Sequence, residues 1–78
     1  MSKGLIEACI RDSLERYFVD LGNNQPHSVH AMIIQAAEKP MLEVVMKHAE
    51  GNQSKAAEWL GINRNTLRRK LLDHQLIK

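Results

Sequence analysis

The side chains best suited to chemistry in this 78-residue chain are grouped near its C-terminal end. Arginine, asparagine, threonine and lysine occur there within eight residues: Asn63, Arg64, Asn65, Thr66, Arg68, Arg69 and Lys70. A planar guanidinium group can hold a guanine edge or a phosphate with two hydrogen bonds. Asparagine can read a base or cap a helix, and threonine can bond a phosphate. This mixture favours recognition of DNA over catalysis.

The positive charge is unevenly distributed along the chain. Residues 51–78 carry a net charge of +4 from six basic and two acidic side chains, whereas residues 1–50 carry −2 from five basic and seven acidic ones. Such asymmetry is typical of a chain that binds a polyanion. The alternative is a solvated helix face at Arg68, Arg69 and Lys70, where cations suit the C-terminal end of the helix dipole.

Two short helices are expected to position these side chains, one over Gln53–Leu60 and one from Arg64 to about Asp73. Asn52 can cap the first helix, and Gly61 supplies the tolerance of positive φ that the intervening turn needs. A helix, a short glycine-containing turn and a second helix make the outline of a helix-turn-helix. The residues expected to pack the two helices together are Ala56, Ala57, Leu60, Ile62, Leu67 and Leu71.

The first fifty residues show an apolar stripe with helical spacing. We expect a first helix from about Leu5 to Leu21 and a second over Val29–His48, with Ser28 as its N-cap and Gly51 as its stop. Pro40 lies inside the second pattern, although proline removes a backbone donor and clashes with the preceding turn. The stripe keeps its phase across Pro40, which predicts one kinked helix and not two.

The length of the chain predicts a single small domain that is stabilised by oligomerisation. A lone core of this size rarely supplies more than about 3–5 kcal/mol. Cys9 is the only cysteine, so no internal disulfide can form, and we expect it to fill the core. No apolar run approaches the roughly 20 residues that a membrane-spanning helix needs. A protein of the reducing cytoplasm is therefore expected.

Three segments resemble the Fis (factor for inversion stimulation) family. The strongest is residues 51–71, which read GNQSKAAEWLGINRNTLRRKL. Upstream, residues 40–46 read PMLEVVM and are similar to the family's central helix, including its internal proline. Residues 14–21 resemble its first helix, so the resemblance covers nearly the whole chain.

This resemblance implies an all-α fold of four helices. The helices within residues 1–50 would interlock with those of a second copy as an intertwined homodimer core, and residues 51–78 would form the helix-turn-helix. Proteins of the family are nucleoid-associated and regulate transcription in the bacterial cytoplasm. They bind and bend DNA, and their weak specificity depends on DNA shape. No cofactor is implied.

Individual residues take roles from the same resemblance. Arg64 would contact a guanine edge, and Asn63 would sense the neighbouring base while also capping its helix. The residues that match DNA-backbone contacts are Asn52, Ser54, Thr66, Arg68, Arg69 and Lys70. Only about four residues precede the first expected helix, where other members carry a recombinase-contacting arm, so we expect no recombinase partner. Contact with the transcription machinery is left open.

Two other functions and one other site remain as alternatives. One function is a dedicated repressor with a single tight operator, and the other is a protein-binding helical adaptor dimer. His27 and His30 have the spacing of metal ligands on one helix, but they lack further convergent ligands, so we expect no metal site. No phosphate loop, nucleophile elbow or acid–base pair is evident, which argues against an enzyme.

Overall fold

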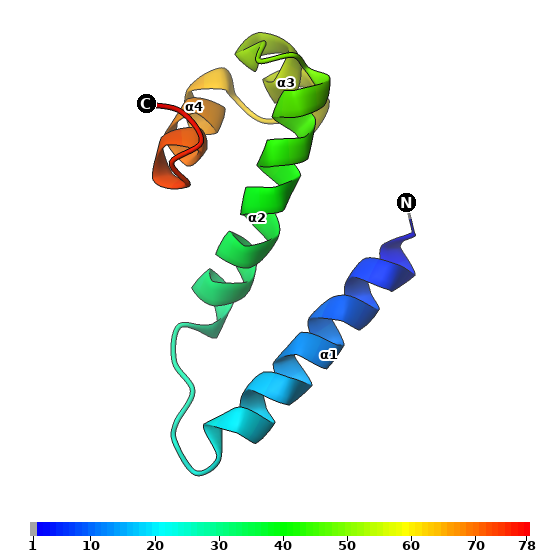
Figure 1. Cartoon of the computed structure of the whole chain (residues 1–78), viewed down its shortest axis with the longest axis vertical. Helices are drawn as coiled ribbons and strands as arrows, with labels where there is room; N and C mark the ends of the chain where they lie inside the picture. The colour runs from blue at the N-terminus through cyan, green and yellow to red at the C-terminus, as the bar shows by residue number, and fades with distance from the viewer. Residues whose placement is uncertain (1) are drawn as a thin grey trace. The chain divides into compact units, whose positions relative to one another are not determined.

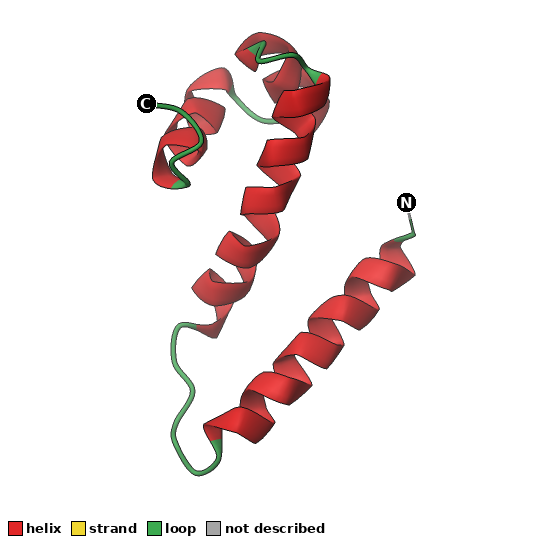
Figure 2. Ribbon diagram, in the orientation of Figure 1, coloured by secondary structure: helices red, strands yellow, loops and turns green. Residues whose placement is uncertain are grey.

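The computed structural model describes residues 2–78, which form four α-helices and no strand. The helices are α1 (Lys3–Leu21), α2 (Val29–His48), α3 (Gln53–Leu60) and α4 (Arg64–Asp73). Figure 1 shows them in chain order, and Figure 2 shows that loops and turns account for the rest of the described chain. The predicted all-α, four-helix fold is therefore confirmed. No helix within residues 2–78 is both long and apolar enough to span a membrane.

The chain divides into two compact units, one reaching to Ile33 and the other covering Ile34–Lys78. The sequence placed its functional boundary later, between residues 50 and 51. The structural boundary is earlier because Leu42 and Ala49 of the α2 end pack into the same core as α3 and α4. Which part dimerises and which part binds DNA remain predictions.

The first unit contains no buried side chain on α1. Ser2 caps this helix by accepting a hydrogen bond from the Gly4 N–H at 3.2 Å. The predicted stripe is half-buried at Ile10, Leu14, Tyr17 and Leu21. Phe18, the next apolar residue after Tyr17, is 49% exposed. Cys9 is exposed as well, so its predicted place in the core is not found in this chain.

The second unit has a core of its own. Its buried members come from α2, α3, α4 and the turn after α2, and none is more than 4% exposed: Leu42, Ala49, Ala56, Ala57, Leu67 and Leu71. Half-buried side chains pack around them, including the predicted Leu60 and Ile62. The sequence analysis missed Leu76 and Ile77, which close this core from the C-terminal segment.

One helix, α2, runs through Pro40, as predicted. The carbonyl of Ala36 loses its usual helical donor at this proline. Both residues lie on exposed positions, so water can satisfy that carbonyl. The continuity of α2 therefore agrees with the unbroken phase of the apolar stripe.

The two ends of α2 differ from the prediction in detail. Ser28 has a φ of 52°, whereas a side-chain N-cap has an extended backbone, so Ser28 does not cap α2 in the predicted way. At the other end, the Glu50 N–H bonds the Lys47 carbonyl and the Gly51 N–H bonds the Met46 carbonyl. This Schellman pattern places Glu50, with a φ of 54°, at the left-handed position that closes the helix. The stop is therefore one residue earlier than predicted.

Candidate nucleic-acid interface

The helices α3 and α4 are joined by the turn that the sequence predicted. Gly61 adopts the left-handed conformation (φ 73°, ψ 30°), and its N–H bonds the Glu58 carbonyl. The next N–H, that of Ile62, reaches back to the Ala57 carbonyl, which completes a second Schellman ending. Ala56 and Ala57 are buried and small, so α4 can pack closely against α3. The pair forms a helix-turn-helix.

The helix α4 has one buried ridge and one outer ridge. Leu67 and Leu71 are fully buried. A position two residues away on an α-helix lies about 200° around the axis. Arg69 is two residues from both leucines, and Asn65 is two residues from Leu67, so these polar side chains lie opposite the core. This outer ridge is the part of α4 that a groove in DNA can receive.

Most of the predicted site residues are exposed on these helices and their first turns. Asn52 and Ser54 lie at the start of α3. The others lie at the start or along the exposed faces of α4: Asn63, Arg64, Thr66, Arg68 and Arg69. Seven of the eight predicted residues are therefore exposed to solvent within one helix-turn-helix.

Asn52 and Asn63 each cap a helix. The Asn52 Oδ1 accepts from the Lys55 N–H at 3.0 Å, and the Asn63 Oδ1 accepts from the Asn65 N–H at 2.7 Å. An asparagine amide also has two N–H donors, which these caps leave unused. Each side chain can therefore cap its helix and still donate to a base or a phosphate.

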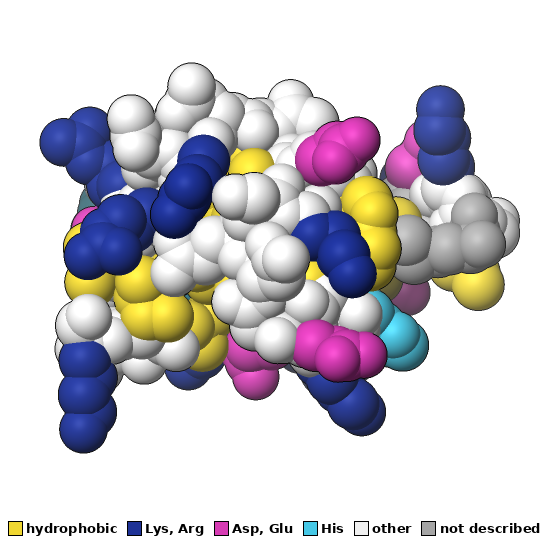
Figure 3. All heavy atoms as spheres, turned by 90° about the horizontal axis from the view of Figure 1, so that it is seen from above, with side chains coloured by type: hydrophobic (Ala, Val, Ile, Leu, Met, Phe, Trp, Pro, Cys, Tyr) yellow, Lys and Arg dark blue, Asp and Glu magenta, His cyan; other side chains and the backbone are white. Residues whose placement is uncertain are grey.

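The arginines of α4 make no ion pair with another described residue. The salt bridges found within residues 2–78 join Glu38 to Lys70 and to His74. Arg64, Arg68 and Arg69 are exposed, so their guanidinium charges face water. In the space-filling view, lysine and arginine side chains project from the surface at separate points (Figure 3). Each of these arginines is available to a phosphate or a base.

Lys70 differs from the prediction. It was expected on the exposed face, but its side chain is only 34% exposed, and Nζ donates to the Glu38 Oε2 at 2.7 Å. The physical reason is its position: Lys70 is three residues after the buried Leu67, so it lies beside the core and within reach of α2. Its ammonium group is already partnered by a carboxylate in the chain without DNA.

Lys55 and Trp59 form a small exposed pair on α3. The Lys55 Nζ lies 5.8 Å from the centroid of the Trp59 ring, within the range of a cation–π contact. Trp59 is 56% exposed, so it lies at the surface and not under the two helices.

Asn65 belongs to the polar group near the C-terminal end but takes no role from the family resemblance, although it lies on the outer ridge with Arg69. The available signal was the four-residue spacing between the two, which places them on the same helix face. Asn65 carries the amide group that pairs with adenine in major-groove recognition. It therefore joins the candidate interface.

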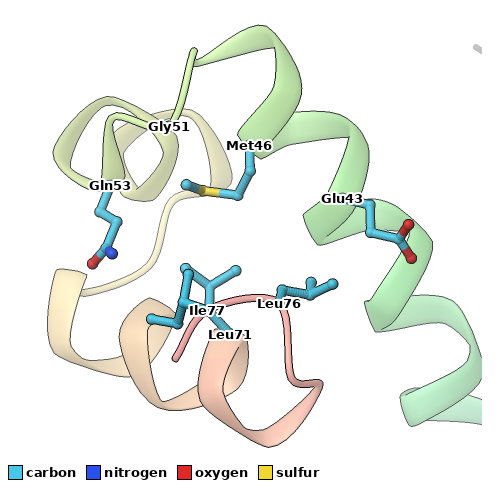
Figure 4. A pocket seen from close by; sticks show the side chains of 7 residues that line it. All are labelled: Glu43, Met46, Gly51, Gln53, Leu71, Leu76 and Ile77. Atoms are coloured by element: carbon cyan, nitrogen blue, oxygen red, sulfur yellow. The ribbon is translucent and has the colours of Figure 1, made fainter.

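The second unit also contains an open hollow of about 440 Å³ between α2, α4 and the C-terminal segment (Figure 4). Met46, Leu71, Leu76 and Ile77 make its walls mostly apolar, with Glu43 as the one ionisable side chain among the lining residues. A single carboxylate offers no acid–base pair. Within residues 2–78 there is no group of three or more side chains able to hold a metal ion.

The fold and the exposed polar helix define the class of the protein: a helix-turn-helix protein. Residues 31–74 match the model of the family described as "Bacterial regulatory protein, Fis family". The chain is 56% identical over 77 residues to a protein named as a Fis-like DNA-binding protein in Ralstonia nicotianae. That alignment covers 99% of this chain and all of the relative.

Relatives with the same description occur in other bacteria. In Neisseria meningitidis one is 51% identical over 92% of this chain and 91% of its own length. In Pseudomonas aeruginosa one is 44% identical over 87% of this chain and 69% of its own length. The chain belongs to the Fis family, and the prediction that it is not an enzyme is confirmed.

Proposed function

We propose that the chain binds duplex DNA as a homodimer, bends it, and acts as a nucleoid-associated protein and transcriptional regulator. The observation that carries this proposal is the set of three arginines exposed on α4, none of which is paired with a carboxylate of the described chain. A helix anchored by Leu67 and Leu71 presents these charges on a rigid support. The DNA-binding names of the relatives support the same function.

Within this function, Arg64 reads a guanine edge at the first turn of α4, with Asn63 beside it. Recognition helices of this motif commonly contact bases through their N-terminal residues. The remaining exposed residues of the set hold the DNA backbone: Asn52, Ser54, Thr66, Arg68 and Arg69. These contacts fix the register of the protein on the duplex without reading its sequence.

The homodimer is supported by apolar surface that the single chain leaves in water. On α2, Ile34, Met41 and Val44 are 44–55% exposed and lie at helical spacing on one side. On α1, Leu5 and Val19 are more than 70% exposed. A monomeric domain rarely exposes large apolar side chains in rows along its helices, so a second copy is the natural cover. Two recognition helices then face one duplex.

Bending follows from the family's close spacing of the two recognition helices. The DNA must curve, or its central minor groove must narrow, for both helices to enter successive major grooves. Sequence at the uncontacted centre is then read as deformability. A duplex with an A/T-rich centre should bind more tightly than one with a G/C-rich centre, while the salt dependence of binding stays the same.

The test of the DNA-reading roles compares Arg64→Ala with Arg69→Ala. We expect Arg64→Ala to lose about 1–3 kcal/mol of discrimination between a selected duplex and a random one. Arg69→Ala should weaken both duplexes alike, because a phosphate contact carries no sequence information. Affinities measured on both duplexes by fluorescence anisotropy give the two ratios. Equal ratios for the two variants would contradict the roles, and an adaptor would bind neither duplex.

A further inference from the structure

The carboxylate of Glu38 joins α2 to the recognition helix α4 through two side chains. Its Oε2 accepts from Lys70 Nζ at 2.7 Å, and its Oε1 accepts from the His74 Nε2–H at 3.0 Å. The Glu38 and His74 side chains are only 15% and 11% exposed. Both oxygens of one shielded carboxylate are therefore used, one to hold Lys70 in the last turn of α4 and one to hold His74, the residue that follows the helix.

These polar residues extend the apolar contact between the two helices. Glu38 lies one turn before the fully buried Leu42 on α2. Lys70 on α4 and His74 at its C-cap follow the buried Leu67 and Leu71 at spacings of three residues, and so lie beside the same apolar contact. The helices are thus fixed by an apolar contact and, next to it, by an ionic one. Two fixed points define a crossing angle, whereas one allows α4 to pivot.

We propose that Glu38 is a positioning residue for DNA recognition: it sets the angle at which α4 presents Arg64 to the groove, and Lys70 acts through Glu38 instead of on a phosphate. Arg64 lies six residues before Lys70, about 9 Å along the helix axis. A pivot at the C-terminal end of α4 therefore displaces the base-reading end. This proposal rests on the proposed DNA binding.

Electrostatics alone predicts that removing an acidic residue strengthens DNA binding, whereas the positioning role predicts that removing the Glu38 charge weakens it. Removing a negative charge from a DNA-binding protein normally strengthens its attraction to the polyanion. Glu38→Gln should instead weaken binding to a selected duplex, because the Lys70 and His74 contacts lose their charged acceptor. Exposed ion pairs contribute little, but this carboxylate is shielded and carries two hydrogen bonds.

The experiment measures affinity for two duplexes of equal length, one selected from a random pool as the tightest binder and one of random sequence. For Glu38→Gln we expect the selected duplex to bind roughly 5- to 30-fold more weakly, the factor set by one or two lost charge-assisted hydrogen bonds. Random DNA should change by less than about 3-fold, since phosphate contacts tolerate a tilt. The matched control is Glu43→Gln, which removes the same charge from an exposed position on the same helix. The control should bind both duplexes as tightly as the wild type or more tightly.

A second arm examines Lys70 through the salt dependence of binding. If Lys70 contacted a phosphate, Lys70→Gln would flatten the slope of log affinity against log salt by about 0.9 per subunit. We expect an unchanged slope, and no further loss when Lys70→Gln is added to Glu38→Gln. This arm remains informative even if Glu38→Gln alone fails to fold, and thermal melting identifies that case.

The outcomes separate the two proposals. If the wild-type chain bound neither duplex, the proposed function would be overturned and the positioning role with it. If the wild type binds and Glu38→Gln behaves like Glu43→Gln, only the positioning role is overturned. A flatter salt slope for Lys70→Gln would mean that Lys70 contacts a phosphate, and that result would also overturn the positioning role.

Discussion

The two compact units of the chain differ in how they satisfy their apolar side chains. The unit of Ile34–Lys78 buries six apolar residues to 4% exposure or less, and three of them are leucines with no exposed surface. The other unit, which contains α1, buries none on that helix. The helix-turn-helix therefore has its own core, whereas α1 is stable only if something else covers its stripe.

The largest effect on the difference between the two units should come from a substitution that introduces a charge into the apolar stripe of α1. Leu14→Glu should abolish dimerisation, because an unpaired charge at a covered interface costs about 3 kcal/mol or more per subunit. Sedimentation should then give a monomer mass, and helix content should fall as α1 loses its cover. The neighbouring exposed variant Glu15→Gln is the control and should remain dimeric. The comparison itself would be wrong if the wild type melted at a temperature independent of protein concentration.

A second variant acts on the unit that has a core. Leu71→Ala should lower the free energy of unfolding by about 2–5 kcal/mol, because it leaves a cavity at a fully buried site. Leu72→Ala is the matched control, since Leu72 is 43% exposed and its truncation leaves no cavity. Urea unfolding followed by the fluorescence of the single tryptophan, Trp59, measures both. Equal losses for the two leucines would contradict the assigned core.

Acid should weaken the second unit through Glu38. The ammonium group of Lys70, with His74 in support and burial opposing, lowers the pKa of Glu38 below its ordinary value of 4.5. A lowered folded-state pKa means that the carboxylate stabilises the fold above pH 4.5 and that this stability disappears as pH falls through the folded-state value. Urea titrations between pH 6 and pH 3 measure the free energy of unfolding, and Glu38→Gln should lose the part of its pH dependence that comes from the Glu38 carboxylate. If the wild type and Glu38→Gln gave the same pH profile, this contribution of Glu38 would be excluded.

The smallest expected effects concern the helix ends. Glu50 occupies a left-handed position that costs a residue with a Cβ about 1 kcal/mol, so Glu50→Gly should stabilise the second unit by up to that amount. Gly61→Ala should destabilise it by a similar amount. No atom lies within 4 Å of the added Cβ there, so the loss would come from the backbone alone. Thermal melting of both variants tests the pair, and shifts of the same sign would contradict the assignment.

Local pattern was sufficient to predict much of this fold. The bounds of α2, α3 and α4 follow from spacing, caps and glycines, and the left-handed Gly61 follows from the need for a tight turn. The burial of Leu67 and Leu71 follows from their four-residue spacing. All of these are settled by residues within one or two turns of each other.

The rest depended on partners that are distant in sequence. Lys70 and Glu38 are separated by 32 residues, and no periodicity indicates that a lysine will leave the polar face to meet a carboxylate. On α2, nothing local separates Leu42, which is buried, from Met41, which is 46% exposed. The left-handed residue that closes α2 was expected at Gly51, one position too late, because glycine is the usual residue there and here Glu50 takes that conformation.

The asparagine cap of α4 has a consequence for the entropy of binding. Its Oδ1 is held by the Asn65 N–H at 2.7 Å before any ligand arrives, so Asn63 loses little rotamer freedom when it meets DNA. The long side chains of Arg68 and Arg69 are not held in this way, and ordering each of them on a phosphate costs up to about 2 kcal/mol. Among the residues proposed to contact bases, Asn63 is therefore ordered in advance, whereas the exposed arginines, Arg64 included, keep their rotamers until contact. Such a division would let one protein settle on many duplexes of slightly different shape.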